Sequence, residues 1–125
     1  MTAPDEETIR RLLERSYELW NAGDKDGYVA NLQELAPGGF SLEDPVGTPP
    51  KETPQSVAEM FDGDVGWKMI TEQIIVCGNS AARISRAEGM AEGQPVSVRA
   101  VDTFDFADDG SVRIRVWYGA PATPS

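Results

Sequence analysis

The stretch VSVRAVDTFDF, residues 96–106, contains the pattern that decides the fold. Successive side chains of a β-strand point to opposite faces, so residues of equal parity share a face. The even positions from 96 to 106 are apolar with one exception, Asp102, whereas the odd positions are mostly polar. The alternation predicts a strand with one face on the core, and it places Asp102 on that apolar face.

Three neighbouring runs have the same character and are separated by short turn sequences. Residues 71–77, 80–88 and 112–118 are rich in apolar and β-branched side chains, and the separators are Gly78-Asn79, the segment 92–95 and Asp108-Asp109-Gly110. Separators this short predict an antiparallel meander. The single cysteine, Cys77, ends the first run, and we expect it to be a small buried strand residue.

The N-terminal half reads as helices. Asp5 precedes a helical repeat whose inward positions are Ile9, Leu12, Leu13, Ser16 and Trp20, and Asp24 can cap a second helix that ends near Leu35. A short strand over residues 40–44 follows, and Thr53-Pro54 opens a short third helix that runs to Phe61. Helices followed by a sheet predict one α+β domain over residues 1–125, with the sheet curled over the helices around a ligand site.

Composition removes several classes of function. The chain has 125 residues, a formal net charge of −10 and no histidine. The acidic surface disfavours nucleic acid and membranes as partners, and an acidic N-terminus without a long apolar run predicts a cytoplasmic protein. Without histidine there is no histidine-based triad or zinc site, and one cysteine forms no internal disulfide or thiolate cluster. Proton transfer would need carboxylates, Tyr, Lys or Cys77.

A second aspartate lies on an apolar face. In the short strand, Asp44 shares its parity with Phe40, Leu42 and Val46. Burial raises the pKa of a carboxyl group, and two carboxyls in one apolar cavity tend to divide into a base and a proton donor. The ordinary alternative is that each acid is the partner of an arginine, for which the candidates are Arg83, Arg86, Arg113 and Arg115.

Several segments resemble a known family in its own order along the chain. They are Asn21-Ala22-Gly23-Asp24, the run LEDPVG at 42–47 with Pro49-Pro50, residues 57–61, residues 93–95, the run VDTFDF at 101–106, and Trp117-Tyr118-Gly119. Together they resemble the bacterial Δ5-3-ketosteroid isomerases, which belong to the SnoaL-like and nuclear transport factor-like superfamily. The Glu-Asp-Pro-Val-Gly segment is the most specific of these matches.

The resemblance implies a cone-shaped, cystatin-like α+β fold, in which a curved antiparallel or mixed sheet wraps around three N-terminal helices, and commonly a homodimer. It implies that Asp44 moves the proton and that a protonated Asp102 helps to bind the enolate oxygen. The family's oxyanion tyrosine falls on Ser16. Tyr17 is adjacent, but one residue turns a helix by roughly 100°.

We therefore expect an isomerase-type acid–base enzyme that needs no cofactor or metal and acts on an apolar, steroid-like or polycyclic ketone. Catalysis is assigned to Asp44 and Asp102, and substrate binding to Ser16, Trp20, Met60, Phe61, Trp67, Phe104 and Tyr118. Two alternatives stay open. One is a polyketide or polyether cyclase or epoxide hydrolase with the same aspartates, for which Glu72 is a spare acid. The other is a non-catalytic module that binds an apolar ligand.

Overall fold

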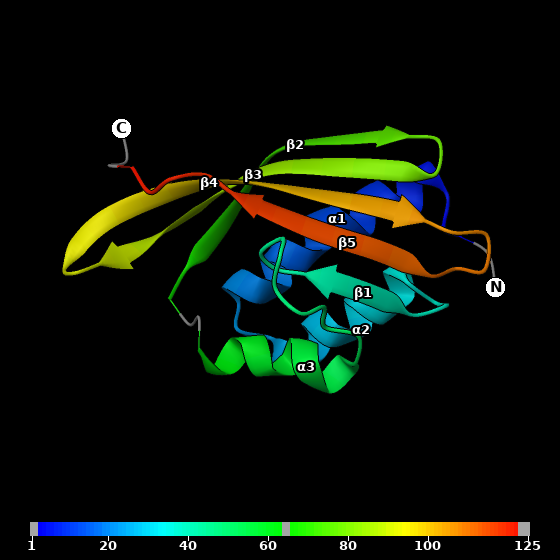
Figure 1. Cartoon of the computed structure of the whole chain (residues 1–125), viewed down its shortest axis with the longest axis horizontal. Coiled ribbons are helices and arrows are strands. Elements are labelled where there is room, and N and C mark those ends of the chain that lie inside the picture. The colour runs from blue at the N-terminus through cyan, green and yellow to red at the C-terminus, as the bar shows by residue number, and fades with distance from the viewer. Residues whose placement is uncertain (1–2, 64–65, 123–125) are drawn as a thin grey trace.

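Three helices and a five-stranded mixed sheet make up the fold (Figure 1). The computed structural model describes residues 3–63 and 66–122. The helices are α1 (Glu6–Asn21), α2 (Lys25–Leu35) and α3 (Pro54–Ala58), and a 3-10 turn, Glu59–Asp62, continues α3. The strands are β1 (Phe40–Glu43), β2 (Lys68–Cys77), β3 (Ser80–Ala91), β4 (Gln94–Phe106) and β5 (Val112–Tyr118).

The sheet has the order β1-β5-β4-β3-β2. Strands β2 to β5 form the predicted antiparallel meander, while β1 joins the far edge parallel to β5. The sheet is open, and the helices lie against one of its faces (Figure 1). The α+β class is therefore confirmed, with three helices and a mixed sheet as expected.

The helix starts follow their capping residues. The Asp5 side chain accepts a hydrogen bond from the Thr8 amide at 2.8 Å, and Asp24 accepts one from the Gly27 amide at 2.9 Å. Thr53 caps α3 with a reciprocal bond to Ser56. Each cap satisfies backbone donors that a helix N-terminus leaves without partners. No helix among the described residues is long and apolar enough to span a membrane.

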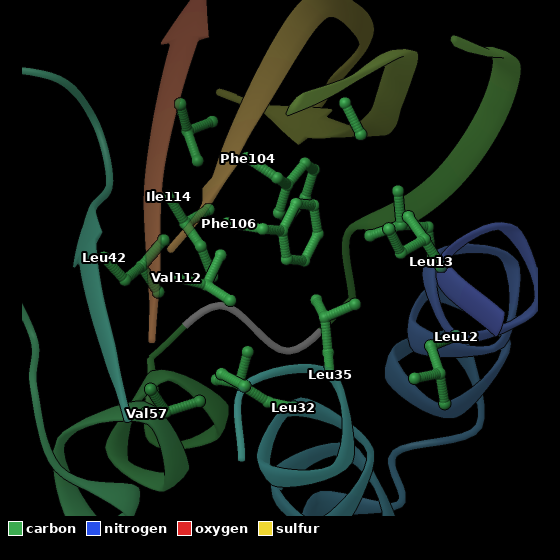
Figure 2. Packing of buried hydrophobic residues seen from close by; sticks show 14 residues of the cluster. Leu12, Leu13, Leu32, Leu35, Leu42, Val57, Phe104, Phe106, Val112 and Ile114 are labelled. Carbon is green, nitrogen blue, oxygen red and sulfur yellow. The ribbon is translucent and has the colours of Figure 1, made fainter. Parts of the chain in front are cut away.

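The core lies between the helices and the inner face of the sheet (Figure 2). Alternation along β4 is as predicted, since Ala100, Asp102, Phe104 and Phe106 are buried while Arg99, Val101 and Asp105 are exposed. Ten of the buried apolar residues are labelled in Figure 2: Leu12, Leu13, Leu32, Leu35, Leu42, Val57, Phe104, Phe106, Val112 and Ile114.

The turn between β3 and β4 is shorter than predicted. Only Glu92 and Gly93 turn, with φ of 52° and 79°, so strand pairing resumes at once between Ala91 and Gln94. Both strands are longer than expected, and their hairpin extends beyond the helices (Figure 1).

The expectation for Cys77 was wrong. This residue is exposed, because it lies at the hairpin end of the edge strand β2 on the outer parity, opposite Ser80.

The loop before β1 closely approaches the turn between β4 and β5 at Gly38. A Cβ atom built there would lie 2.4 Å from the Asp109 carbonyl oxygen, and the Gly38 amide donates to the Gly110 carbonyl at 2.8 Å. We expect Gly38→Ala to lower the free energy of unfolding by about 1–3 kcal/mol, because backbone atoms cannot move aside as a flexible side chain can.

Urea denaturation measures this effect, with Gly63→Ala as the matched control. A Cβ at Gly63 meets nothing within 4 Å, so that change should shift the free energy of unfolding by less than about 1 kcal/mol. Equal effects of the two variants would contradict the close approach at Gly38.

Candidate active site

A cavity of about 500 Å³ lies between the helices and the sheet. Asp44 and Asp102 both line it, and so do six of the residues assigned to substrate binding from the sequence: Ser16, Trp20, Met60, Trp67, Phe104 and Tyr118. Phe61 does not line this cavity. Its ring packs against Trp20 and Tyr28, with ring centroids 4.5 and 5.4 Å away.

Asp44 directly follows β1, at the sheet edge. The amide of Val46 donates to the Val116 carbonyl at 2.9 Å, which fixes this segment beside the end of β5. The Tyr118 hydroxyl donates to Asp44 Oδ1 at 2.8 Å. Partial burial and the nearby Asp44 carboxylate raise the pKa of Tyr118 above its ordinary value, so the phenol keeps its proton and holds the carboxylate.

Asp102 lies opposite Arg83 on β3, and the two side chains form a buried ion pair. Arg83 Nε donates to Asp102 Oδ2 at 3.1 Å, and Nη2 donates to the same oxygen. Burial alone would lower the pKa of Arg83, but the Asp102 charge and hydrogen bonds more than offset it, and the pKa is raised. The arginine-partner alternative therefore holds for Asp102. Asp102 accepts hydrogen bonds from a guanidinium, whereas the resemblance implies a protonated acid that donates one.

Arg83 also fixes α1 against the sheet. Its Nη1 donates to the Leu13 carbonyl at 2.8 Å and to Ser16 Oγ at 2.6 Å. The guanidinium carbon lies 3.6 Å from the centroid of the Tyr17 ring, within the range of a cation–π contact.

Tyr17 faces inward, although the sequence pattern assigned the inward position to Ser16 and placed Tyr17 roughly 100° away from it. It is buried, and its hydroxyl donates to Asp102 Oδ2 at 3.2 Å. Ser16 also lines the cavity, but its hydroxyl donates to the Leu13 carbonyl. The spacing of Ile9, Leu13 and Tyr17, four residues each, could have identified Tyr17, because side chains at i and i+4 share a helix face.

Other residues reach the cavity without having been predicted. Arg83 and Ala87 come from the inner face of β3, where Ala81, Arg83, Ser85 and Ala87 alternate as buried positions. Tyr28 and Asn31 come from α2. Burial of the Tyr28 hydroxyl raises its pKa to about 12.

Glu72, the spare acid of the cyclase alternative, is not among the lining residues. It sits at a bulge of β2 and pairs instead with Arg86 and Arg99, at 3.5 and 3.2 Å. Within residues 3–63 and 66–122, no group of three or more Cys, Asp or Glu is placed to hold a metal ion.

Comparison with known proteins assigns this architecture to a family. The model of the SnoaL-like domain matches residues 13–115, most of the chain. The chain belongs to the SnoaL-like domain family. The predicted superfamily is therefore confirmed, while a special closeness of this SnoaL-like protein to ketosteroid isomerases stays a prediction. No curated protein matches the chain in sequence.

Two solved structures illustrate the similarity. One is SalBIII, an epoxide hydrolase/cyclase-like enzyme with a role in pyran ring formation in the polyether salinomycin. It is 25% identical with a TM-score of 0.73, over 92% of this chain and 93% of SalBIII. The other, from Jannaschia sp. CCS1, is described as a SnoaL-like polyketide cyclase. It is 22% identical with a TM-score of 0.70, over 94% of this chain and 90% of that one.

The buried pair makes a prediction about stability. Arg83→Met leaves the Asp102 carboxylate buried without its counter-charge, and we expect the free energy of unfolding to fall by about 3–5 kcal/mol. The double variant Arg83→Met/Asp102→Leu should recover most of that loss. Arg99→Met, which breaks an exposed pair with Glu72, is the control and should cost less than about 1 kcal/mol. Similar losses in Arg83→Met and Arg99→Met would contradict a buried pair.

The three tyrosines make a prediction about pH. All have pKa values raised mainly by burial, Tyr28 to about 12, above the reference value near 10. The folded state then holds these protons more tightly than the unfolded state, so stability is complete below pH 10 and falls as the pH rises from 10 towards 12. Absorbance at 295 nm should show no tyrosine titrating near pH 10 in the folded protein, and a midpoint there would contradict the raised pKa values.

Proposed function

We propose that this SnoaL-like protein is an acid–base enzyme that acts on a largely apolar molecule. It catalyses attack by the oxygen of a hydroxyl group on an electrophilic carbon, most simply an epoxide carbon, so that the epoxide ring opens. Asp44 is the general base. The observation that carries the proposal is the buried Arg83–Asp102 ion pair, in the same cavity as Asp44.

The ion pair bears directly on the isomerase alternative. An enolate intermediate concentrates negative charge on one oxygen, which needs hydrogen-bond donors around it. A carboxylate donates no hydrogen bond, and its charge repels an enolate. Hydroxyl groups, by contrast, donate hydrogen bonds to carboxylates readily, so two carboxylates in one apolar cavity suit a hydroxyl-bearing substrate better than a ketone.

The proposed reaction balances with the groups present. Asp44 takes the proton of the attacking hydroxyl, the new C–O bond forms, and the epoxide C–O bond breaks to leave an alkoxide. The proton then passes to the alkoxide, for which Tyr118 provides a route, since its hydroxyl is already hydrogen-bonded to Asp44. The raised pKa of Tyr118 is no obstacle, because an alkoxide is a stronger base than a phenolate.

The comparisons support this class of chemistry. SalBIII is described as epoxide hydrolase/cyclase-like and as acting in pyran ring formation, and it has the same fold over nearly its whole length. A pyran forms when a hydroxyl group of a molecule attacks a carbon of that same molecule, so the reaction type is the one that two hydroxyl-accepting carboxylates favour.

Steroid-type isomerisation is the second candidate, and Tyr17 is the observation that favours it. This phenol lies in the cavity beside Asp102, where it supplies the group that Ser16 lacks. A β,γ-unsaturated 3-ketosteroid separates the two candidates, because isomerisation produces a conjugated enone that absorbs strongly near 240 nm.

Homodimerisation also stays a proposal. Trp117 and Val101 are neighbours across β5 and β4 on the outer face of the sheet, and they are 40% and 38% exposed. A second copy packed on this face would remove both from water.

Asp44→Asn tests the proposed base. The amide keeps the shape of the side chain but cannot take a proton, so we expect the rate of epoxide opening in a hydroxy-epoxide substrate to fall by about 10²–10⁴-fold. Product formation is followed by mass spectrometry or chromatography, with folding checked by circular dichroism.

The matched control is Glu43→Gln. Glu43 is the preceding residue and pairs with Arg113 at 3.4 Å, outside the cavity lining, so its loss should leave the rate within about twofold. A fully active Asp44→Asn protein would refute Asp44 as the base, whereas a wild type that opens no epoxide and forms no enone would leave the non-catalytic binding module. Enone formation by the wild type, without epoxide opening, would favour the isomerase.

A further inference from the structure

The two oxygens of Asp102 have different surroundings. Oδ2 accepts hydrogen bonds from Arg83 Nε, from Arg83 Nη2 and from the Tyr17 hydroxyl. Oδ1 is buried and has no hydrogen-bond partner within the described part of the chain. A buried acceptor without a donor is costly, and a buried charged one more so. Because Asp102 lines the cavity, a donor on the ligand would complete its hydrogen bonds.

Asn31 presents a second acceptor of the same kind. Its Nδ2 donates to the Leu12 carbonyl at 2.8 Å, which fixes the orientation of the amide. Oδ1 of Asn31 is then directed away from that carbonyl, and it too is buried without a partner among the described residues. Asn31 is 6% exposed and lines the same cavity as Asp102.

The two donors that contact Asp102 are hydrogen-bonded within the protein. Arg83 donates to Asp102, Leu13 and Ser16, and the Tyr17 hydroxyl donates to Asp102. The unpartnered oxygens of Asp102 and Asn31 are therefore acceptors for a ligand. A hydroxyl group satisfies an acceptor, whereas a ketone oxygen, itself only an acceptor, does not.

We infer that the substrate is bound through hydroxyl groups, one donated to Asp102 Oδ1 and a second donated to Asn31 Oδ1. The ligand is a hydroxylated, otherwise apolar ring or chain compound rather than a ketone. This deepens the proposed function, on which it rests, because a substrate that carries its own hydroxyl favours ring closure over hydrolysis by water.

The test compares trans-2-decalol with trans-2-decalone, which share one skeleton and differ in the oxygen. Calorimetric titration of the wild type should show the alcohol binding at least about tenfold more tightly, since a site built for a hydroxyl rejects an analogue without one. Equal affinities, or tighter binding of the ketone, would overturn the inference without the use of any variant.

Asp102→Asn should reverse this preference. Its amide oxygen can take over the bonds from Arg83 and Tyr17, and its NH₂ group then faces the cavity as a donor that suits the ketone. Asp105→Asn is the control, with the same substitution on the exposed face of the same strand, and it should keep the wild-type ratio. An unchanged ratio in a folded Asp102→Asn protein would also overturn the assignment to Asp102.

The second contact is tested with the 2,6- and 2,7-diols of decalin. At least one isomer should bind about fivefold more tightly than decalol, and Asn31→Leu should remove that gain. If no diol exceeds decalol in the wild type, the Asn31 contact is refuted. These are equilibrium measurements, so their failure would leave the Asp44 rate experiment intact, and a failure of that experiment would leave the hydroxyl preference intact.

Discussion

The guanidinium group of Arg83 is buried beneath α1 and needs a negative charge beside it. The arrangement of most of the site depends on how Asp102 supplies that charge. Arg83 and Asp102 face each other on the adjacent strands β3 and β4. Substitution of either residue would leave the charge of the other buried without its partner. Nη1 of Arg83 donates to the α1 backbone at Leu13 and to the Ser16 hydroxyl, and the flat face of the guanidinium lies on the Tyr17 ring. One ion pair thus sets the rotation of α1 and the polarity of the cavity.

The two aspartates differ because their supports differ. Asp102 is held on β4, in the middle of the sheet, by an arginine and a phenol. Asp44 follows a four-residue edge strand and accepts a bond from a tyrosine that is itself 44% exposed. Equal side chains in unequal surroundings can differ in chemistry, and the proposed function assigns proton exchange to Asp44 and a fixed hydrogen-bonding role to Asp102.

Strand alternation predicted more of this site than any other pattern. It placed Asp102 and Asp44 on apolar faces, because a period of two leaves little ambiguity once a strand is regular. It left the Asp102 partner open among four arginines, since pairing depends on register, which the sequence alone did not fix. Tyr17 was missed because Ser16 and Tyr17 both border the inward stripe of α1, and the choice between them depends on the contacts of Arg83 with that helix.

The edge position of β1 gives Asp44 a different structural support from that of Asp102. A short ladder ties the segment before Asp44 to β5, and an isolated bridge between Leu42 and Lys51 holds its other side, whereas Asp102 is embedded between long strands on both sides. Under the proposed function, sequence changes in the loop that follows β1 would move the Asp44 carboxylate relative to a bound substrate while Asp102 stays in place. A fold arranged in this way can acquire a new reaction through small changes near the edge strand β1. The central strands β3 and β4, whose ion pair supports folding, then need no change.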